Sequence, residues 1–125
     1  MILDTNALSA FVDGDPKVGV ILRRAPRAMI PVIVIGEFRY GIAQSRNRRI
    51  YEAWLATRLA EFEVLPVTEA TASAYAALRV ELKRAGRPIP ANDAWIAALA
   101  LEHRSAVLSR DEHFDVVPGL ERRYW

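Results

Sequence analysis

Short apolar segments alternate with longer amphipathic segments along the whole chain. The apolar segments are typical of buried strands, and they cover residues 1–3, 28–32, 64–67 and 105–109, with 116–120 as a candidate fifth element. In the segments between them, apolar side chains recur every three or four residues, which is the spacing of one helix face. This spacing predicts helices over residues 7–12, 16–24, 33–44, 47–62, 69–85 and 92–103.

Residues that cap or end helices mark several of these boundaries. Pro16 stands in a first turn, where its missing N–H is not needed, and Thr68 and Asn92 are predicted N-caps. Gly86 is expected to end the helix that follows Thr68, because glycine readily adopts the left-handed conformation found there. Short strands separated by helices predict the α/β class, with a parallel sheet of four to five strands and helices on both of its faces.

The composition indicates one compact domain over residues 1–125. The hydrophobic share is 52% and the charged share 26%, which suits a buried core and excludes a disordered chain. Cysteine is absent, so disulfide scaffolds, thiol nucleophiles and thiolate zinc sites are excluded. No uncharged stretch is longer than residues 28–36, whereas a membrane-spanning helix needs roughly 20 apolar residues. We therefore expect a cytoplasmic protein that is not attached to a membrane.

The cations are mostly of one type. The chain has 17 Lys and Arg against 15 Asp and Glu, a formal charge of +2, and 15 of the cations are arginine. Arginine makes forked hydrogen bonds to phosphate and carboxylate groups. The bias is compatible with an anionic partner such as nucleic acid, but it does not decide the question, because a whole proteome can prefer arginine.

Four acidic residues fall where the predicted fold forms its sites. In a parallel α/β sheet, sites lie beyond the carboxyl ends of the strands. Asp4 directly follows the first strand, and Asp111 comes two residues after the fourth. Asp93 stands in the first turn of the last long helix, and Glu37 lies one turn into the helix after the second strand. We expect these carboxylates at one edge of the sheet.

Each acid also has an ordinary structural explanation. Asp93 suits the positive end of a helix dipole, and Asp111 suits a turn. Glu37 is harder to explain in this way, because its neighbours at helical spacing are apolar or small and an unpartnered carboxylate there is costly. Asp4 is harder still, because it directly follows three apolar residues. Taken together, the acids favour one shared site.

Carboxylates that lie close together either take up protons or bind a cation. Oxygen ligands favour Mg²⁺ or Mn²⁺ over Zn²⁺, particularly because cysteine is absent and His103 and His113 are not at ligand spacing. Such ions bind substrate phosphates, activate a water molecule and stabilise the attacking and leaving oxygens of an in-line displacement. The four acids therefore predict phosphodiester hydrolysis.

Four segments carry a resemblance to a known family: Met1–Asn6, Ile30–Gly41, Gly86–Ala98 and Leu108–Phe114. With these segments in this order and spacing, nearly the whole chain resembles PIN-domain ribonucleases, and most closely the VapC toxins of type II bacterial toxin–antitoxin systems. The resemblance implies a single PIN domain over residues 1–125 with a three-layer α/β/α fold. It also implies a metal-dependent endoribonuclease that forms a homodimer. A cognate VapB-type antitoxin would bind it in a heterotetramer or larger complex and occlude or disorder the metal site.

Carried over residue by residue, the resemblance assigns catalysis and binding of Mg²⁺ or Mn²⁺ to the acids that the fold argument selects: Asp4, Glu37, Asp93 and Asp111. We expect the first three to hold the principal ion, and the fourth to complete this site or support a second, weaker one. Supporting hydrogen bonds are implied for Thr5, Asn6, Asn92 and Ser109. A metal-activated water would attack the RNA phosphorus and leave 5′-phosphate and 3′-hydroxyl ends. Gly36 departs from the family, which more often has alanine or a larger aliphatic residue there.

Two arginines are the better candidates for gripping the RNA backbone. Arg84 and Arg87 flank the loop that leads to the last long helix, so we expect them to contact phosphate near the metal. The arginines of residues 46–49 are better explained as a solvated helix start. No acid is placed beside His103 or His113 by the sequence, so a general-base role is not expected for either.

Three alternative functions fit parts of the sequence. A haloacid-dehalogenase-like phosphatase needs a second aspartate at position 6, which is asparagine. A phospho-receiver domain needs an acidic pair there and a lysine after a late strand, and neither Lys17 nor Lys83 is so placed. The third alternative is a PIN-like domain that acts mainly as a non-catalytic binding or regulatory partner. The four acids argue against it, and a divalent-cation titration would separate the two. The RNA that is cut and the number of metal ions stay open.

Overall fold

The computed structural model describes all residues from 1 to 125 and contains one parallel β-sheet. Its five strands are short: β1 (Ile2–Leu3), β2 (Met29–Pro31), β3 (Glu63–Leu65), β4 (Val107–Leu108) and β5 (Arg122–Arg123). Their order across the sheet is β3-β2-β1-β4-β5, and every neighbouring pair is parallel. Because β1 is central, the residues that follow it lie beside the ends of both β2 and β4.

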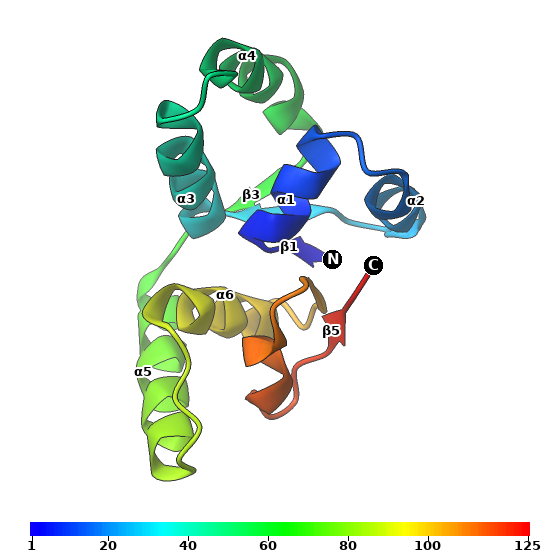
Figure 1. Ribbon diagram of the computed structural model, residues 1–125. Coiled ribbons are helices and arrows are strands. Elements are labelled where there is room, and N and C mark those ends of the chain that lie inside the picture. The colour runs from blue at the N-terminus through cyan, green and yellow to red at the C-terminus, as the bar shows by residue number, and fades with distance from the viewer.

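Six α-helices connect and cover the strands: α1 (Thr5–Val12), α2 (Pro16–Arg24), α3 (Val32–Ala43), α4 (Arg48–Arg58), α5 (Glu69–Arg84) and α6 (Ala91–Glu102). Two short 3₁₀ helices, η1 (Leu59–Glu61) and η2 (Glu112–Val116), complete the regular structure. Figure 1 shows α1 to α4 on one side of the sheet and α5 and α6 on the other. The predicted α/β class, the parallel sheet and the helices on both faces are confirmed, and the number of strands is five.

The core lies on both faces of the central strands. The side chains of β1 and β4 are completely buried, as expected for strands that are covered from both sides. Helix α6 is buried almost continuously from Ala94 to Ala100, and it packs against α5 and α3. Its small, buried alanine side chains let α5 and α3 approach it closely.

Two helices have boundaries that differ from the sequence prediction by more than one residue. Helix α1 begins at Thr5 rather than at Ala7, because Asp4 caps it and accepts a hydrogen bond from the Thr5 backbone N–H. Helix α4 ends at Arg58 instead of reaching Phe62, and the chain tightens into η1 before β3 begins. The earlier start of α1 matters most, since it makes the acid after β1 a part of the helix terminus.

Two further predictions are wrong in their placement. Asn92 is not the N-cap of α6, because the helix begins at Ala91 with the extended backbone of Pro90 before it, and Asn92 lies in the first turn. The fifth strand is not at residues 116–120 but at Arg122–Arg123. A polar strand at the edge of a sheet shows no apolar pattern by which the sequence could mark it.

The remaining helix signals behave as predicted. Thr68 and Thr71 form a reciprocal capping box at the start of α5, and Pro16 occupies the first turn of α2. Gly86 follows the end of α5 with a φ of 69°, a left-handed conformation that side chains disfavour. No helix in the structure combines the length and the apolar character that crossing a membrane requires.

Candidate metal centre

The ends of β1 and β4 and the N-terminal halves of α3, α6 and η2 meet at the carboxyl edge of the sheet. Asp4 directly follows β1, and Asp111 caps η2 shortly after β4. Asp93 is in the first turn of α6, and Glu37 lies in the second turn of α3. Their carboxylates lie close enough for mutual repulsion to contribute to the raised pKa values of Asp4, Glu37 and Asp93. The structure therefore brings together the four acids that the sequence singled out.

Asp4 is the most enclosed of the four, with 5% of its surface exposed. Its Oδ1 accepts a hydrogen bond from the Thr5 backbone N–H at 2.7 Å. Its Oδ2 accepts from Ser109 Oγ at 2.7 Å and from Asn6 Nδ2 at 2.9 Å. Burial raises the pKa of Asp4, and these hydrogen bonds offset part of the rise. The three donors hold the carboxylate in one orientation and leave Oδ1 with a lone pair for a cation.

Ser109 links the two central strands at the base of the site. Its side chain is fully buried, and its hydroxyl donates to Asp4 while it accepts from Asn6 Nδ2 at 3.1 Å and from the Asp111 backbone N–H at 2.9 Å. Asn6 Oδ1 in turn accepts from the Arg110 backbone N–H at 3.1 Å. This network ties the residue after β1 to the turn after β4. The geometry suits the supporting role predicted for Asn6 and Ser109, and the role itself stays a prediction.

Glu37 has a buried oxygen without a partner. Its Oε1 is shielded from solvent and makes no hydrogen bond, and the same holds for Thr5 Oγ1. Burial is the main cause of the raised pKa of Glu37, followed by the charge of Asp4, while the nearby side chains of Thr5 and Asn92 lower it. Leaving a buried acceptor unpaired costs about 1–3 kcal/mol. A cation bound to Glu37 Oε1 would remove this cost.

His113 joins the acids, which the sequence did not indicate. Its Nδ1 lies 2.8 Å from Asp93 Oδ2 and 3.0 Å from Asp111 Oδ1, and its backbone N–H donates to Asp111. The contact with Asp93, aided by the charge of Asp111, raises the pKa of His113. One ligand atom from each of these three residues lies within 4.8 Å of the others, so His113 is an additional candidate ligand. The contacts overturn the expectation that His113 has no acid beside it. The one feature of the sequence that could have indicated this contact is the position of His113 two residues after Asp111.

The site has a surplus of negative charge. None of the four acids forms an ion pair with lysine or arginine, and His113 is their one cationic partner. Elsewhere acids are paired with arginine, as Glu63 is with Arg27. Carboxylate oxygens in the absence of sulfur ligands are the donors that Mg²⁺ and Mn²⁺ prefer. The residues present therefore fit a divalent-cation site.

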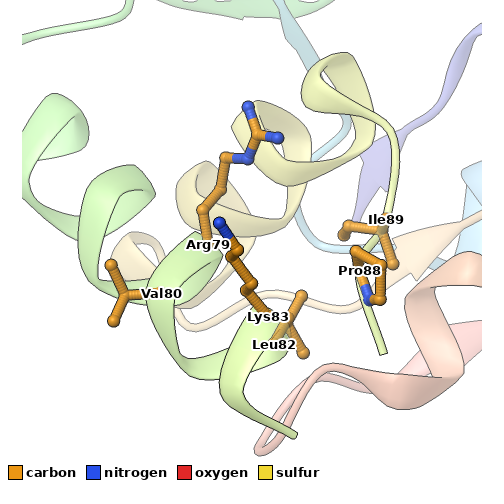
Figure 2. Close-up of a pocket in the computed structure, with 6 residues that line it drawn as sticks. All are labelled: Arg79, Val80, Leu82, Lys83, Pro88 and Ile89. Atoms are coloured by element: carbon orange, nitrogen blue, oxygen red, sulfur yellow. The ribbon is translucent and has the colours of Figure 1, made fainter. Parts of the chain in front are cut away.

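The two arginines predicted to contact RNA lie on another element. Arg84 is the last residue of α5, and Arg87 stands in the loop that runs back along α5 to α6 (Figure 1). Both are exposed, and neither side chain makes a hydrogen bond or ion pair. A hollow of about 480 Å³ lies between α5 and this loop, and Figure 2 shows Arg79 and Lys83 on its α5 side. None of the four acids lines this hollow, so the contact of Arg84 and Arg87 with RNA stays a prediction.

The family of the chain follows from its match to a family model. The model that matches is described as the PIN domain, and the match covers residues 1–120. The chain belongs to the PIN domain family. This confirms the resemblance carried by the four sequence segments.

Known relatives of this PIN domain include two from Mycobacterium tuberculosis (strain ATCC 25618 / H37Rv). Ribonuclease VapC4 is 36% identical over 97 residues, which are 74% of this chain and 72% of the relative. Ribonuclease VapC5 is 32% identical over 126 residues, 94% of this chain and 87% of the relative. Among solved structures, VapBC-5 from Mycobacterium tuberculosis, a member of the VapBC family of toxin–antitoxin systems, matches with a TM-score of 0.71. It is 30% identical and covers 98% of this chain and 94% of that chain.

Proposed function

We propose that this PIN domain, spanning residues 1–125, is a VapC-type endoribonuclease toxin. It hydrolyses RNA phosphodiester bonds with Mg²⁺ or Mn²⁺, and a VapB-type antitoxin neutralises it. The sequence relatives are described as ribonucleases, and the solved relative is described as a member of a toxin–antitoxin family. The observation that carries the proposal is the set of four carboxylates that meet at the carboxyl edge of the sheet without a lysine or arginine partner.

The proposed ligands of the principal ion are Asp4, Glu37 and Asp93, with Asp111 and His113 beside them. When bound, a divalent cation lowers the pKa of a coordinated water and offsets the negative charge that develops on the phosphate. Hydrogen bonds fix the orientation of the Asp4 carboxylate. Glu37 Oε1 makes no hydrogen bond in the protein that would compete with a cation. His113 Nδ1 lies 2.8 Å from Asp93 and 3.0 Å from Asp111, and a protonated His113 balances part of their charge.

The charge distribution supports a polyanionic substrate. Four carboxylates repel a phosphodiester, so RNA can enter this site only when cations have neutralised them. The rest of the chain carries 17 Lys and Arg against the remaining 11 acids, a surplus of six positive charges. Such a surplus attracts RNA at long range and makes its binding weaker at high salt. Phosphate contact by Arg84 and Arg87 belongs to this proposal.

We further propose that the protein works as a homodimer and joins its antitoxin in a heterotetramer or a larger complex. The VapBC relative, whose description names a toxin–antitoxin system, supports the complex with an antitoxin, and the homodimer is implied by the resemblance to VapC toxins. Light scattering of the purified protein, alone and with its antitoxin, measures both assemblies. A toxin that stays monomeric at micromolar concentration would contradict the dimer.

The test of the enzymatic proposal is RNA cleavage by the purified wild-type protein. We expect cleavage in Mg²⁺ or Mn²⁺ that stops when EDTA is added, with 5′-phosphate and 3′-hydroxyl ends on the products. A 5′-phosphate-dependent exonuclease distinguishes these ends from the 5′-hydroxyl products of metal-independent ribonucleases. Cleavage that persists in EDTA would contradict the proposal. A protein that binds its antitoxin but neither cleaves RNA nor binds divalent cations would be a non-catalytic binding partner.

A further inference from the structure

A cavity of about 250 Å³ begins beside the metal centre and runs between α1, α3 and α4, the helices above the sheet in Figure 1. Along α1 it is lined by residues four apart, from Thr5 to Asp13, and along α3 by residues from Glu37 onward. Because a helix rises about 1.5 Å per residue, the cavity extends about 12 Å along α1. Thr5 and Glu37 therefore border one end, and Asp13 borders the other.

The polar groups at the end away from the acids include both donors and acceptors. The Tyr51 hydroxyl donates to Asp13 Oδ1 at 2.9 Å, which leaves the Tyr51 oxygen and Asp13 Oδ2 free to accept. The Ser45 hydroxyl accepts from the Asn47 backbone N–H at 3.1 Å, so its own proton is free to donate. An occupant that satisfies this end must both donate and accept hydrogen bonds.

The walls suit a flat, partly apolar group. Phe38 lines the cavity and is nearly buried, and its ring meets the ring of Tyr51 edge to face, with centroids 6.0 Å apart and planes at 77°. Gly41 leaves the α3 wall open, because a Cβ added there would meet nothing within 4 Å. An engineered cavity of about 150 Å³ accepts one benzene ring, so this cavity is large enough for a nucleobase.

We propose that this cavity is a nucleobase subsite. It receives the base of a nucleotide next to the cleaved phosphodiester, and it prefers a base with an exocyclic amino group over uracil. The proposal rests on the proposed ribonuclease function. Aromatic side chains commonly stack on the unpaired bases of single-stranded RNA, and Tyr51 offers such a ring. An exocyclic amino group can donate to Asp13 Oδ2, whereas the N3–H donor of uracil stands between two carbonyl oxygens that a carboxylate repels.

Other occupants fit the cavity less well. The carboxylates of Asp13 and Glu37 repel a phosphate group. A guanidinium or ammonium group from a protein partner would be attracted by the acids, but it has only donors and would leave the Ser45 hydroxyl without an acceptor. A nucleobase has donors and acceptors on one planar edge, so it matches both the polar end and the aromatic wall.

Two substitutions and one matched control test the subsite. Asp13→Asn keeps an oxygen for the Tyr51 hydroxyl but replaces the free acceptor with an N–H donor. Gly41→Leu fills the cavity from its open wall. Gly36→Leu adds the same side chain to the same helix, at an exposed position that does not line the cavity.

Each protein is assayed in Mn²⁺ under single-turnover conditions, on short RNAs that differ only in the nucleotides on either side of the cleaved bond. Thermal unfolding checks that each variant folds.

We expect the wild type to cleave the RNA with uridine at one flanking position about tenfold more slowly than the others. Asp13→Asn should lose or reverse this preference while cleavage still requires Mn²⁺. Gly41→Leu should slow cleavage of all preferred RNAs about tenfold or more and abolish the preference. Gly36→Leu should cleave the RNAs with the wild-type rates and preference.

The outcomes separate this proposal from the one on which it rests. If the wild type cleaves no RNA in any divalent cation, the ribonuclease function fails, and the subsite fails with it. If metal-dependent cleavage is present but Asp13→Asn and Gly41→Leu retain the wild-type preference and rates, the subsite alone is overturned. If these variants cleave RNA normally but lose affinity for the antitoxin, the cavity belongs to a protein partner, and the proposal is likewise overturned.

Discussion

Replacing Glu37 by glutamine is expected to stabilise the metal-free protein at neutral pH. Glu37 Oε1 is buried without a partner, and the carboxylate lies near the charges of Asp4 and Asp93. Glutamine keeps the shape of the side chain and removes its charge. Two like charges about 4 Å apart repel each other by about 1 kcal/mol even in bulk water, so we expect removal of the Glu37 charge to stabilise the folded protein by about 1 kcal/mol. For a chain of this length, that free energy corresponds to a rise in Tm of about 3–5 °C.

The gain should depend on pH in a defined direction. The pKa of Glu37 is raised in the folded protein above its ordinary value of 4.5, mainly by burial. Folding therefore favours the protonated carboxyl group, and the penalty for the charged form is absent below the ordinary pKa and grows as the pH rises through the raised value. The Tm values of wild type and Glu37→Gln should agree near about pH 4 and diverge toward pH 7.

Divalent cations should reverse the order of stability. An ion at 100 times its Kd stabilises the folded state by about 2.7 kcal/mol, and the variant forfeits part of this gain because it has lost a ligand charge. Thermal unfolding followed by circular dichroism, in EDTA and in saturating Mn²⁺, measures both effects. If Glu37→Gln is less stable than wild type in EDTA at pH 7, or if the difference is the same at both pH values, the reasoning about Glu37 is refuted.

Three further substitutions test other parts of the site. Ser109→Ala removes the hydroxyl that donates to Asp4, so the cleavage rate and the affinity for Mn²⁺ should each fall about 10–100-fold. An unchanged affinity in a Mn²⁺ titration would contradict the supporting role of Ser109. His113→Ala leaves the carboxylates of Asp93 and Asp111 without their cationic partner, so the Tm should fall more in EDTA than in saturating Mn²⁺. Equal losses of Tm would argue against charge balance by His113. Gly36→Ala adds a methyl group in open space on α3, so the free energy of unfolding measured by chemical denaturation should rise by about 0.5–1 kcal/mol with unchanged RNA cleavage. A lower free energy of unfolding would contradict the open space at Gly36.

The four acids could be selected from the sequence because fold topology places them. Asp4 and Asp111 follow strands that are neighbours in a parallel sheet, so their approach does not depend on side-chain detail. Asp93 and Glu37 stand near helix starts at the same edge. The resemblance to a family then pointed to the same residues. Fold class and candidate acids are therefore set by periodicity and by the order of elements, which are both visible in one sequence.

Features that depend on local geometry could not be predicted in this way. The contact of His113 with Asp93 needs the 3₁₀ turn that Asp111 caps, and such a turn has no apolar period. Asn92 has the side chain of an N-cap, but the extended backbone of Pro90 sets the start of α6 one residue earlier. The cavity along α1 depends on how α4 packs back over α3, which brings Tyr51 to Asp13 across a long sequence separation.

RNA cleavage by single acid-to-amide variants tests most directly the claim that these carboxylates form one metal centre that hydrolyses RNA. The proteins compared are wild type, Asp4→Asn, Glu37→Gln, Asp93→Asn and Asp111→Asn, in single-turnover assays over a range of Mn²⁺ concentrations. We expect the wild-type rate to saturate with Mn²⁺ and to vanish in EDTA, and Asp4→Asn, Glu37→Gln and Asp93→Asn to lose about 100-fold or more. A wild-type rate that survives EDTA, or an Asp4→Asn protein that cleaves like wild type, would contradict the account.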